Sequence, residues 1–188
     1  MRRMSQPHAH PATPATAPEP PNALQLSTVP TLQRYLRQLD GLLDLAQSHR
    51  RNGPADEAAL LAARLAPDML PLHTQVLICG NFVPRLQAVL RGTEVQYPDW
   101  PDDLAGLRSQ VAALIRQVEG WTPQDFAAPE RVVEGDAGQA WLRMPLRAWI
   151  QEFALPNFFF HLSAVYLLLR QQGLPLGKAQ FDGLHRYG

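Results

Sequence analysis

One stretch of the chain, from about Leu146 to Gln172, carries so few polar side chains that it limits the folds open to the whole protein. It reads LRAWIQEFALPNFFFHLSAVYLLLRQQ, and Gly173 follows it as a helix stop. A helix that is apolar on most faces has to be surrounded by other helices or by lipid. Unbroken apolar runs are only a few residues long, far short of the ~20 that cross a bilayer, so we expect no transmembrane helix and no membrane partner. The stretch is therefore predicted to be the core helix of a bundle.

Three further segments repeat apolar residues at spacings of three and four, the pattern of a helix with one buried face. They run from about Val29 to Arg51, from Met69 to Leu90 and from Leu104 to Val118. Together with the apolar stretch they make four long helices. The sequence therefore predicts an all-α protein, an up-down four-helix bundle.

The predicted helices begin and end at residues with suitable capping chemistry. Ser27 or Thr28 is the expected N-cap of the first helix, and Asn52-Gly53 is its expected end. Asp68 is the expected N-cap of the second long helix, because Pro71 then falls in the first turn, where no amide donor is needed.

Smaller elements are predicted between the long helices. A short helical piece follows Pro54 and ends near Leu65, and the run Thr122-Pro123-Gln124-Asp125 indicates a brief capped helix. Residues 131–142 place strand-like Arg-Val-Val and Ala-Trp-Leu on either side of a turn from Gly135 to Gly138. This pattern predicts a short β-hairpin between the third and fourth long helices.

Composition and charge narrow the class of protein. The 188 residues, 46% of them hydrophobic, suit one compact domain with a tail. Seven prolines lie at or before Pro30, so residues 1–25 are predicted to be a disordered tail and residues 26–188 the bundle domain. Seventeen Lys and Arg balance seventeen Asp and Glu, so the chain lacks the positive field that nucleic-acid binding needs.

The single cysteine, Cys79, can neither form a disulfide within the chain nor complete a zinc cluster. We therefore expect a protein of the reducing cytoplasm, and the proline-rich start is not an export signal. Cys79 lies on the apolar stripe of the second long helix, where a buried thiol is usually inert. The sequence contains no Gly-rich phosphate loop, nucleophile elbow or His-Glu-x-x-His motif, so no motif names a reaction.

A polar pair inside the apolar stretch is the candidate functional site. Asn157 and His161 are four residues apart, so their side chains leave one face of the helix a turn apart. A buried polar group without a partner costs about 1–3 kcal/mol, so each of them needs one. The second long helix offers His73 and Gln75 on opposite sides of its apolar stripe, so at most one of them faces any given pocket.

Two interpretations of His161 stay open on the sequence. It is either a core histidine satisfied by a neighbouring carbonyl, Gln or Tyr, or a ligand-binding or acid–base group at the mouth of the bundle. Pro156, directly before Asn157, has no amide donor and is expected to leave a carbonyl near Glu152 without its helical hydrogen bond. The resulting kink either wraps the core or opens a pocket.

Two motifs give the chain a family resemblance: ARLAPDMLPLHTQV from Ala63 to Val76 and ALPNFFFHLSAVYLLLRQQGLPLGK from Ala154 to Lys178. From about Leu26 onwards the chain resembles an uncharacterised, domain-of-unknown-function branch of the DinB-like (DinB/YfiT) superfamily of bacterial four-helix bundles. The resemblance implies a homodimer and a divalent metal held by three histidines, one on the second helix and a His-x-x-x-His pair on the fourth. For some members it also implies a metal-dependent transferase that uses a low-molecular-weight thiol.

The chain departs from that ligand set. Asn157 stands at the first position of the fourth-helix pair, and an amide binds zinc or nickel poorly. The motif leaves open whether His73 or Gln75 takes the second-helix position, so His73 and His161 are the expected ligands of any zinc or nickel ion, one short of three. We therefore expect a small-molecule binding or interaction module with an incomplete metal site and no cofactor. The alternative is the thiol-using transferase.

Overall fold

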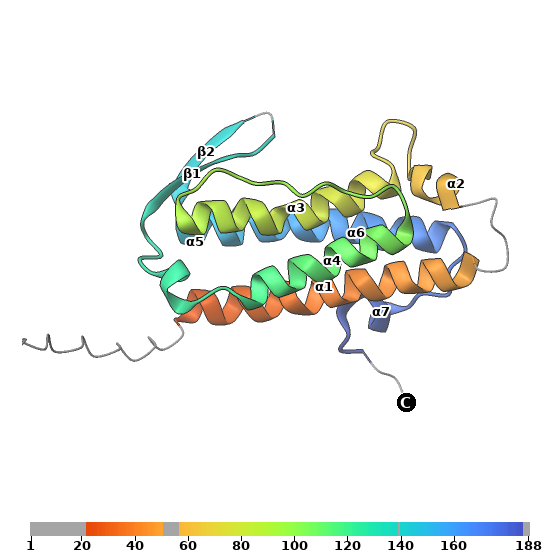
Figure 1. Cartoon of the computed structure of the whole chain (residues 1–188), viewed down its shortest axis with the longest axis horizontal. Coiled ribbons are helices and arrows are strands. Elements are labelled where there is room, and N and C mark those ends of the chain that lie inside the picture. The colour runs from red at the N-terminus through yellow and green to blue at the C-terminus, as the bar shows by residue number, and fades with distance from the viewer. Residues whose placement is uncertain (1–21, 51–56, 139, 186–188) are drawn as a thin grey trace, which may run out of the picture.

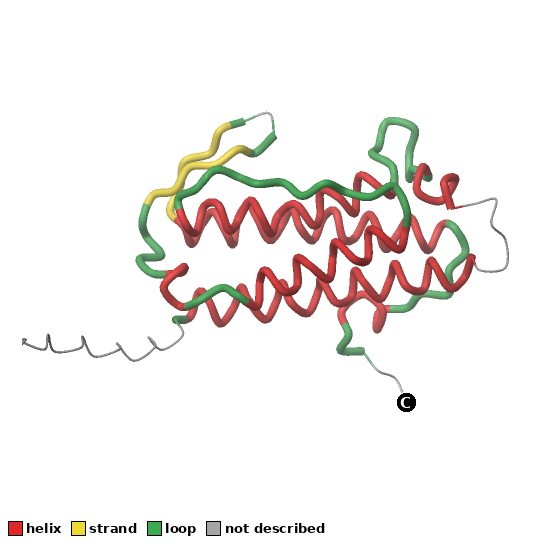
Figure 2. The backbone as a smooth tube through the Cα atoms, viewed as in Figure 1, coloured by secondary structure: helices red, strands yellow, loops and turns green. Residues whose placement is uncertain are grey.

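The computed structural model describes residues 22–50, 57–138 and 140–185 (Figure 1, Figure 2). Four long helices run through these residues and confirm the mostly helical fold: α1 (Ala23–Arg50), α3 (Leu72–Arg91), α4 (Leu104–Glu119) and α6 (Leu155–Gln171). The shorter elements are α2 (Glu57–Ala62), a 3₁₀ turn (Pro123–Phe126), β1 (Val132–Asp136), β2 (Trp141–Pro145), α5 (Leu146–Ala148), a π-helical turn (Trp149–Ala154) and α7 (Lys178–Asp182).

The long helices pack as two antiparallel pairs, α1 with α4 and α3 with α6. Contacts along each pair fix the directions: Arg37 with Glu119 and Asp44 with Arg108 for α1 and α4, and Gln75 with His161 and Cys79 with Phe158 for α3 and α6. The apolar stripes predicted from the sequence lie between the helices of these pairs, in one continuous core.

The two helices α3 and α4 run in the same direction, so the four long helices α1, α3, α4 and α6 run up, down, down and up in chain order. Gly80 lies against Leu114, and further along both helices Gln87 Oε1 accepts a hydrogen bond from Trp121 Nε1. The expected up-down alternation is wrong at this step, because residues 92–101 return along α3 as an extended crossover (Figure 1). Ten extended residues, at about 3.3 Å each, cover the ~30 Å of a 20-residue helix.

Trp100 anchors this crossover against α3. Its ring lies over Gly80, where a Cβ atom would come within 2.6 Å of Trp100 Cζ2 and 2.9 Å of Leu114 Cδ1. Trp100 Nε1 also donates a hydrogen bond to Asn81 Oδ1 at 2.9 Å. The missing side chain of Gly80 therefore lets the crossover lie close to both helices.

The first helix begins six residues before its predicted start, and Asn22 caps it in place of Ser27 or Thr28. Asn22 Oδ1 accepts a hydrogen bond from the backbone N–H of Gln25 at 2.9 Å. The hydroxyls of Ser27 and Thr28 donate to Leu24 O at 3.0 and 2.7 Å, inside the helix. The prediction that either residue is the cap is therefore wrong, because both are satisfied by the preceding turn.

Helix α3, the second of the predicted long helices, also begins differently from the prediction. Pro71 occupies the N-cap position itself, and no side chain caps the helix. Asp68 lies in a turn closed by a hydrogen bond from Met69 N to Ala66 O, so its assignment as the N-cap is wrong. The predicted end of the first helix at Asn52-Gly53 lies outside the described residues.

The predicted hairpin is confirmed, with β1 and β2 antiparallel and Glu134 opposite Arg143. Gly135, however, lies buried inside β1 rather than in the turn. A Cβ atom there would stand 3.1 Å from Trp149 Cζ2 and 3.3 Å from Val89 Cγ2. A close approach to the helices, rather than a turn, therefore requires this glycine.

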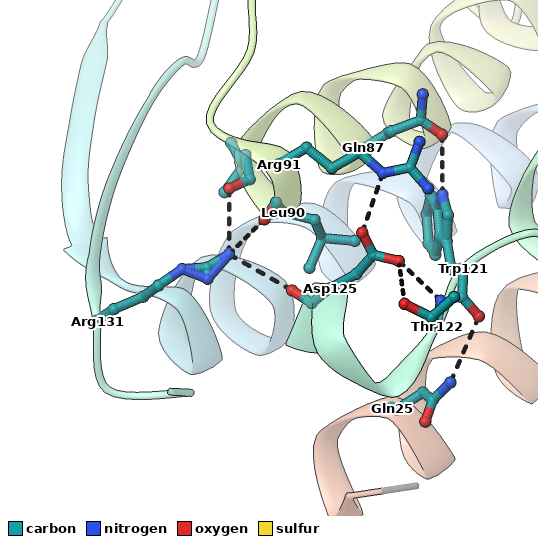
Figure 3. Close-up of polar contacts among 9 residues, drawn as sticks. Gln25, Gln87, Leu90, Arg91, Trp121, Thr122, Asp125 and Arg131 are labelled. Carbon is teal, nitrogen blue, oxygen red and sulfur yellow. Dashed lines mark hydrogen bonds and ion pairs between the residues drawn. The ribbon is translucent and has the colours of Figure 1, made fainter. Parts of the chain in front are cut away.

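A polar network at the end of α3 holds the connection from α4 to the hairpin (Figure 3). Asp125 accepts hydrogen bonds from Arg91 Nε at 3.0 Å and from Thr122 N at 2.7 Å, which confirms the predicted capped turn. Burial disfavours the charge of Asp125, but the bonds from Thr122 and Arg91 outweigh it and lower the pKa of the carboxyl. Arg131 donates to Leu90 O at 2.7 Å and so satisfies a carbonyl at the end of α3.

The apolar stretch forms one helical run, Leu146–Gln171, built from α5, the π-helical turn and α6. In the π turn, Leu155 N donates to Ile150 O five residues back, directly before Pro156. Among the described residues, this run is long and apolar enough to cross a membrane by length and composition alone. The expectation from the sequence considered only unbroken apolar runs, and polar residues interrupt this one. In the structure it packs along α3, and its fully buried residues include Phe158, Leu162, Val165, Leu168 and Leu169.

Candidate functional site

A polar pair joins the two central helices, with His161 on α6 and Gln75 on α3. His161 Nδ1 lies 2.7 Å from Gln75 Oε1. Gln75 is 2% exposed, and its amide nitrogen donates to Leu70 O at 3.3 Å. Because the amide nitrogen has this acceptor, the amide oxygen faces the histidine, and His161 donates from Nδ1. Gln75 rather than His73 is thus the second-helix side chain that faces His161.

The histidine ring presents a neutral acceptor to solvent. Burial, followed by the nearby charge of Arg85, lowers the pKa of His161 to about 4, so the ring is neutral at pH 7. With the proton on Nδ1, Nε2 carries a lone pair. Nε2 has no hydrogen-bond partner among the described residues and is not one of their buried unpartnered atoms, so water reaches it.

Aromatic rings and one guanidinium surround His161. Its ring stacks on Phe82 with centroids 6.3 Å apart and meets the edge of Phe160 at 5.2 Å. The Arg85 guanidinium lies 5.4 Å above the Phe82 ring and donates from Nε to Tyr97 Oη at 2.7 Å. Phe82, Arg85 and Tyr97 were not predicted from the sequence. Phe82 could have been found, because it follows Gln75 by seven residues on one face of a helix.

Two of the predicted site residues point elsewhere. Asn157 Nδ2 donates to Phe153 O at 2.8 Å, within its own helix, instead of extending across the bundle. His73 Nε2 lies 2.9 Å from Pro101 O and 3.6 Å from the exposed carboxylate of Asp102. The structure therefore brings together one pair of the four candidates.

The donor set at this site does not fit a divalent metal centre. The two expected histidine ligands contact different partners, His161 a glutamine oxygen and His73 a loop carbonyl. Across residues 22–50, 57–138 and 140–185, no three His, Cys, Asp or Glu side chains are grouped so that they could hold a metal ion. Amide oxygens are poor ligands for zinc or nickel. The side chains around His161 therefore supply hydrogen bonding and aromatic packing.

The thiol of Cys79 lies one helical turn from Gln75 and is buried. Its Sγ donates to Phe158 O at 3.6 Å, and burial raises the pKa of the thiol well above its ordinary value. Because the thiolate is the nucleophilic form, this cysteine packs the core without reacting, as its place on the apolar stripe predicts.

Comparisons with known proteins agree with the resemblance seen in the motifs. Residues 24–182 match the family described as Domain of unknown function (DUF1993). The fold is similar to the crystal structure of a DinB family member protein from Shewanella denitrificans, with a TM-score of 0.75 and 28% sequence identity, covering 88% of this chain and 94% of that chain. No curated protein matches the sequence. The matched region contains every described helix except the first residue of α1, and the chain belongs to the DUF1993 family as a DinB-like domain of unknown function.

Proposed function

We propose that this domain binds a small molecule at His161. The observation that carries the proposal is a neutral histidine whose Nδ1 proton is held by buried Gln75, while its Nε2 lone pair is open to solvent. A histidine that only packs a core would also be held by Gln75, so the accessible Nε2 acceptor is the feature that favours a ligand. The alternative function, a metal-dependent thiol transferase, has no comparable support, because His73 and His161 contact different partners and no three potential ligands are grouped among the described residues.

The surroundings of His161 define the class of ligand. A hydroxyl or amide N–H of the ligand would donate to Nε2, and its planar or apolar body would lie against Phe160, which is 60% exposed, whereas Phe82 is buried beneath His161 and Arg85. Rings at such distances favour an aromatic or conjugated group. Arg85, held over Phe82, adds a positive charge at the exposed side of the site.

A fragment titration tests this proposal. Aromatic primary amides are compared with their N,N-dimethyl counterparts by saturation-transfer NMR on the wild type and on His161→Phe, which keeps an aromatic ring and removes Nε2. Loss of one neutral hydrogen bond, about 1 kcal/mol, should lower the affinity of the variant for the primary amides about fivefold. Its affinity for the dimethyl amides should stay unchanged. His49→Phe, at an exposed histidine of α1, is the matched control. Equal binding to wild type and His161→Phe would contradict the proposal.

We also propose a homodimer formed through the outer face of α6. Phe160 and Leu167 are 60% and 50% exposed and lie two turns apart on one face of that helix. Exposed aromatic and aliphatic side chains in a row are typical of a homodimer interface.

Light scattering after size exclusion tests the dimer. The wild type should show about twice the 21.0 kDa of one chain at micromolar concentration, and Leu167→Glu should shift it to a single chain. Leu45→Glu places the same charge at a 40% exposed leucine of α1 and should leave the mass unchanged. A wild-type mass of one chain would refute the dimer.

A further inference from the structure

The hairpin and the crossover from α3 to α4 enclose a groove that shares only Tyr97 with the surroundings of His161. Its volume is about 820 Å³. Residues 93–95 and 97 form one wall, β1 forms the other, and the last turn of α3 forms the floor. Figure 1 shows the crossover passing along α3 beside the hairpin. Both walls are extended chain, so the groove is a slot between two strand-like segments.

The hairpin wall of this groove is the edge of β1 rather than one of its faces. All five residues of Val132–Asp136 line the groove, whereas Trp141 alone lines it from the described residues of β2. Successive side chains of a strand point to opposite faces, so a groove that touches every residue in turn runs along the strand's edge.

The hydrogen bonds of the hairpin leave alternate backbone groups of this edge free. Ala137 N donates to Ala140 O, and Leu146 N donates to Arg131 O, so the odd-numbered residues of β1 pair with β2. Bonded and non-bonded positions alternate in an antiparallel pair. The even-numbered residues therefore direct their N–H and C=O groups away from β2 and into the groove; these residues are Val132, Glu134 and Asp136.

The crossover wall also offers free donors. Within the described part of the chain, the backbone N–H groups of residues 94–97 donate no hydrogen bond. Tyr97 and Trp141, which are 46% and 68% exposed, line the same groove. Free backbone donors beside aromatic side chains are features that recognise an extended peptide.

Charge indicates what kind of peptide fits the groove. Of the acidic residues that line the groove, Glu94 and Asp136 have no ion-pair partner among the described residues; of the basic ones, Arg91 is paired with Asp125, and Arg131 donates to Leu90 O at the end of α3. A second copy of β1 would bring acidic residues opposite acidic ones, which disfavours pairing between copies. The chain's own residues 1–21 contain six prolines, which lack the N–H that a strand needs.

We propose that this groove binds an extended segment of a partner protein, which adds as a strand to the free edge of β1. The segment alternates apolar and polar side chains and carries Lys or Arg where it passes Glu94 or Asp136. Its backbone pairs with the even-numbered residues of β1. This interaction is separate from ligand binding at His161 and is unaffected by His161→Phe.

A synthetic peptide, acetyl-Lys-Val-Thr-Val-Thr-Val-Lys-amide, is the probe. At about 3.3 Å per residue it spans the five residues of β1. Hydrogen exchange of the isotope-labelled full chain is followed by NMR with and without the probe. The amides of Val132, Glu134 and Asp136 should exchange at least about tenfold more slowly with the probe, whereas those of Val133 and Gly135, already bonded to β2, should not change.

A pair of proline variants isolates the edge. Glu134 and Arg143 face each other in a non-hydrogen-bonded pair, so proline at either position spares the bonds between β1 and β2. Only Glu134→Pro removes a donor that faces the groove. Glu134→Pro should lower the affinity for the probe at least about tenfold, and Arg143→Pro should lower it less than about twofold. Because proline can unfold the hairpin, a probe with N-methylated valines gives a second measurement and should lose at least about tenfold in affinity for the wild type.

Several outcomes would overturn the proposal. One is failure of the probe to bind at millimolar concentration. Another is equal binding to Glu134→Pro and Arg143→Pro, or unchanged binding of the N-methylated probe. A third is slow exchange of the Val132, Glu134 and Asp136 amides without peptide, because the edge would then already be covered by this chain or by a second copy.

Discussion

Replacing Gly80 with alanine should destabilise the protein, although alanine is the better helix former. Alanine in place of glycine inside a helix gains about 1 kcal/mol. At Gly80 the added methyl would stand 2.6 Å from Trp100 Cζ2 and 2.9 Å from Leu114 Cδ1. The Trp100 ring is rigid and is held by its bond to Asn81, so it has to move as a whole.

Overpacking of this kind costs about 1–3 kcal/mol, which outweighs the helix gain and leaves a net loss of about 1 kcal/mol. Gly41 provides the matched control, because it lies in α1 with nothing within 4 Å of an added Cβ atom. Gly41→Ala should therefore gain about 1 kcal/mol. The two variants should differ by about 2 kcal/mol, or roughly 4–8 °C in Tm for a domain of this size.

Urea unfolding followed by circular dichroism measures both free energies of unfolding, with an unchanged denaturant slope as the condition for comparison. In a Trp100→Ala background, Gly80→Ala should lose most of the penalty, since only the flexible end of Leu114 then remains close to the methyl. Stabilisation of Gly80→Ala by as much as Gly41→Ala, with Trp100 intact, would refute the close packing of the crossover on α3.

Other perturbations test the polar contacts. The pKa of His161 is about 4 in the folded chain and ~6.5 in the unfolded chain, so the unfolded state binds more protons between these two pH values. The Tm should therefore fall as the pH drops from about 6.5 towards 4. The variant His161→Phe should show a smaller fall in Tm over the same pH range. The guanidinium of Arg108 lies 3.0 Å from Asp40 and 2.6 Å from Asp44, and Arg108→Met leaves the two carboxylates without it. The free energy of unfolding in urea should fall by about 1 kcal/mol at low salt and by less at high salt. A thiol reagent should modify Cys79 slowly in buffer and rapidly in urea; equal rates would contradict its burial.

Periodicity predicts which face of a helix is buried, because that depends on nearby residues alone. The stripe of α3 that includes Leu72, Val76, Cys79 and Val83 is fully buried, as expected. The start of α1 was harder to predict, since Pro30 suggests a boundary, yet the helix continues through it. The direction of α4 depends on an extended crossover, which leaves no periodic signal in the sequence.

The candidate site was predictable in part. Spacing places Asn157 and His161 on one face of a helix, but it does not say which side chains on another helix meet them. Packing between α3 and α6 selects Gln75, and the amide of Asn157 is taken up by a carbonyl one turn back. A side-chain amide inside a helix has such a local partner available whatever lies opposite. The groove beside β1 was not predicted, because free backbone groups carry no side-chain signature.

The parallel course of α3 and α4 bears on how fast the chain folds. Neither main helix pair joins neighbours in sequence: Arg37 meets Glu119 across 82 residues, and Gln75 meets His161 across 86. Closing loops of that length costs chain entropy before the contacts form. A bundle in which each helix packs on the next avoids that cost. Folding here should therefore be limited by bringing the two halves of the chain together, after its individual helices have already begun to form.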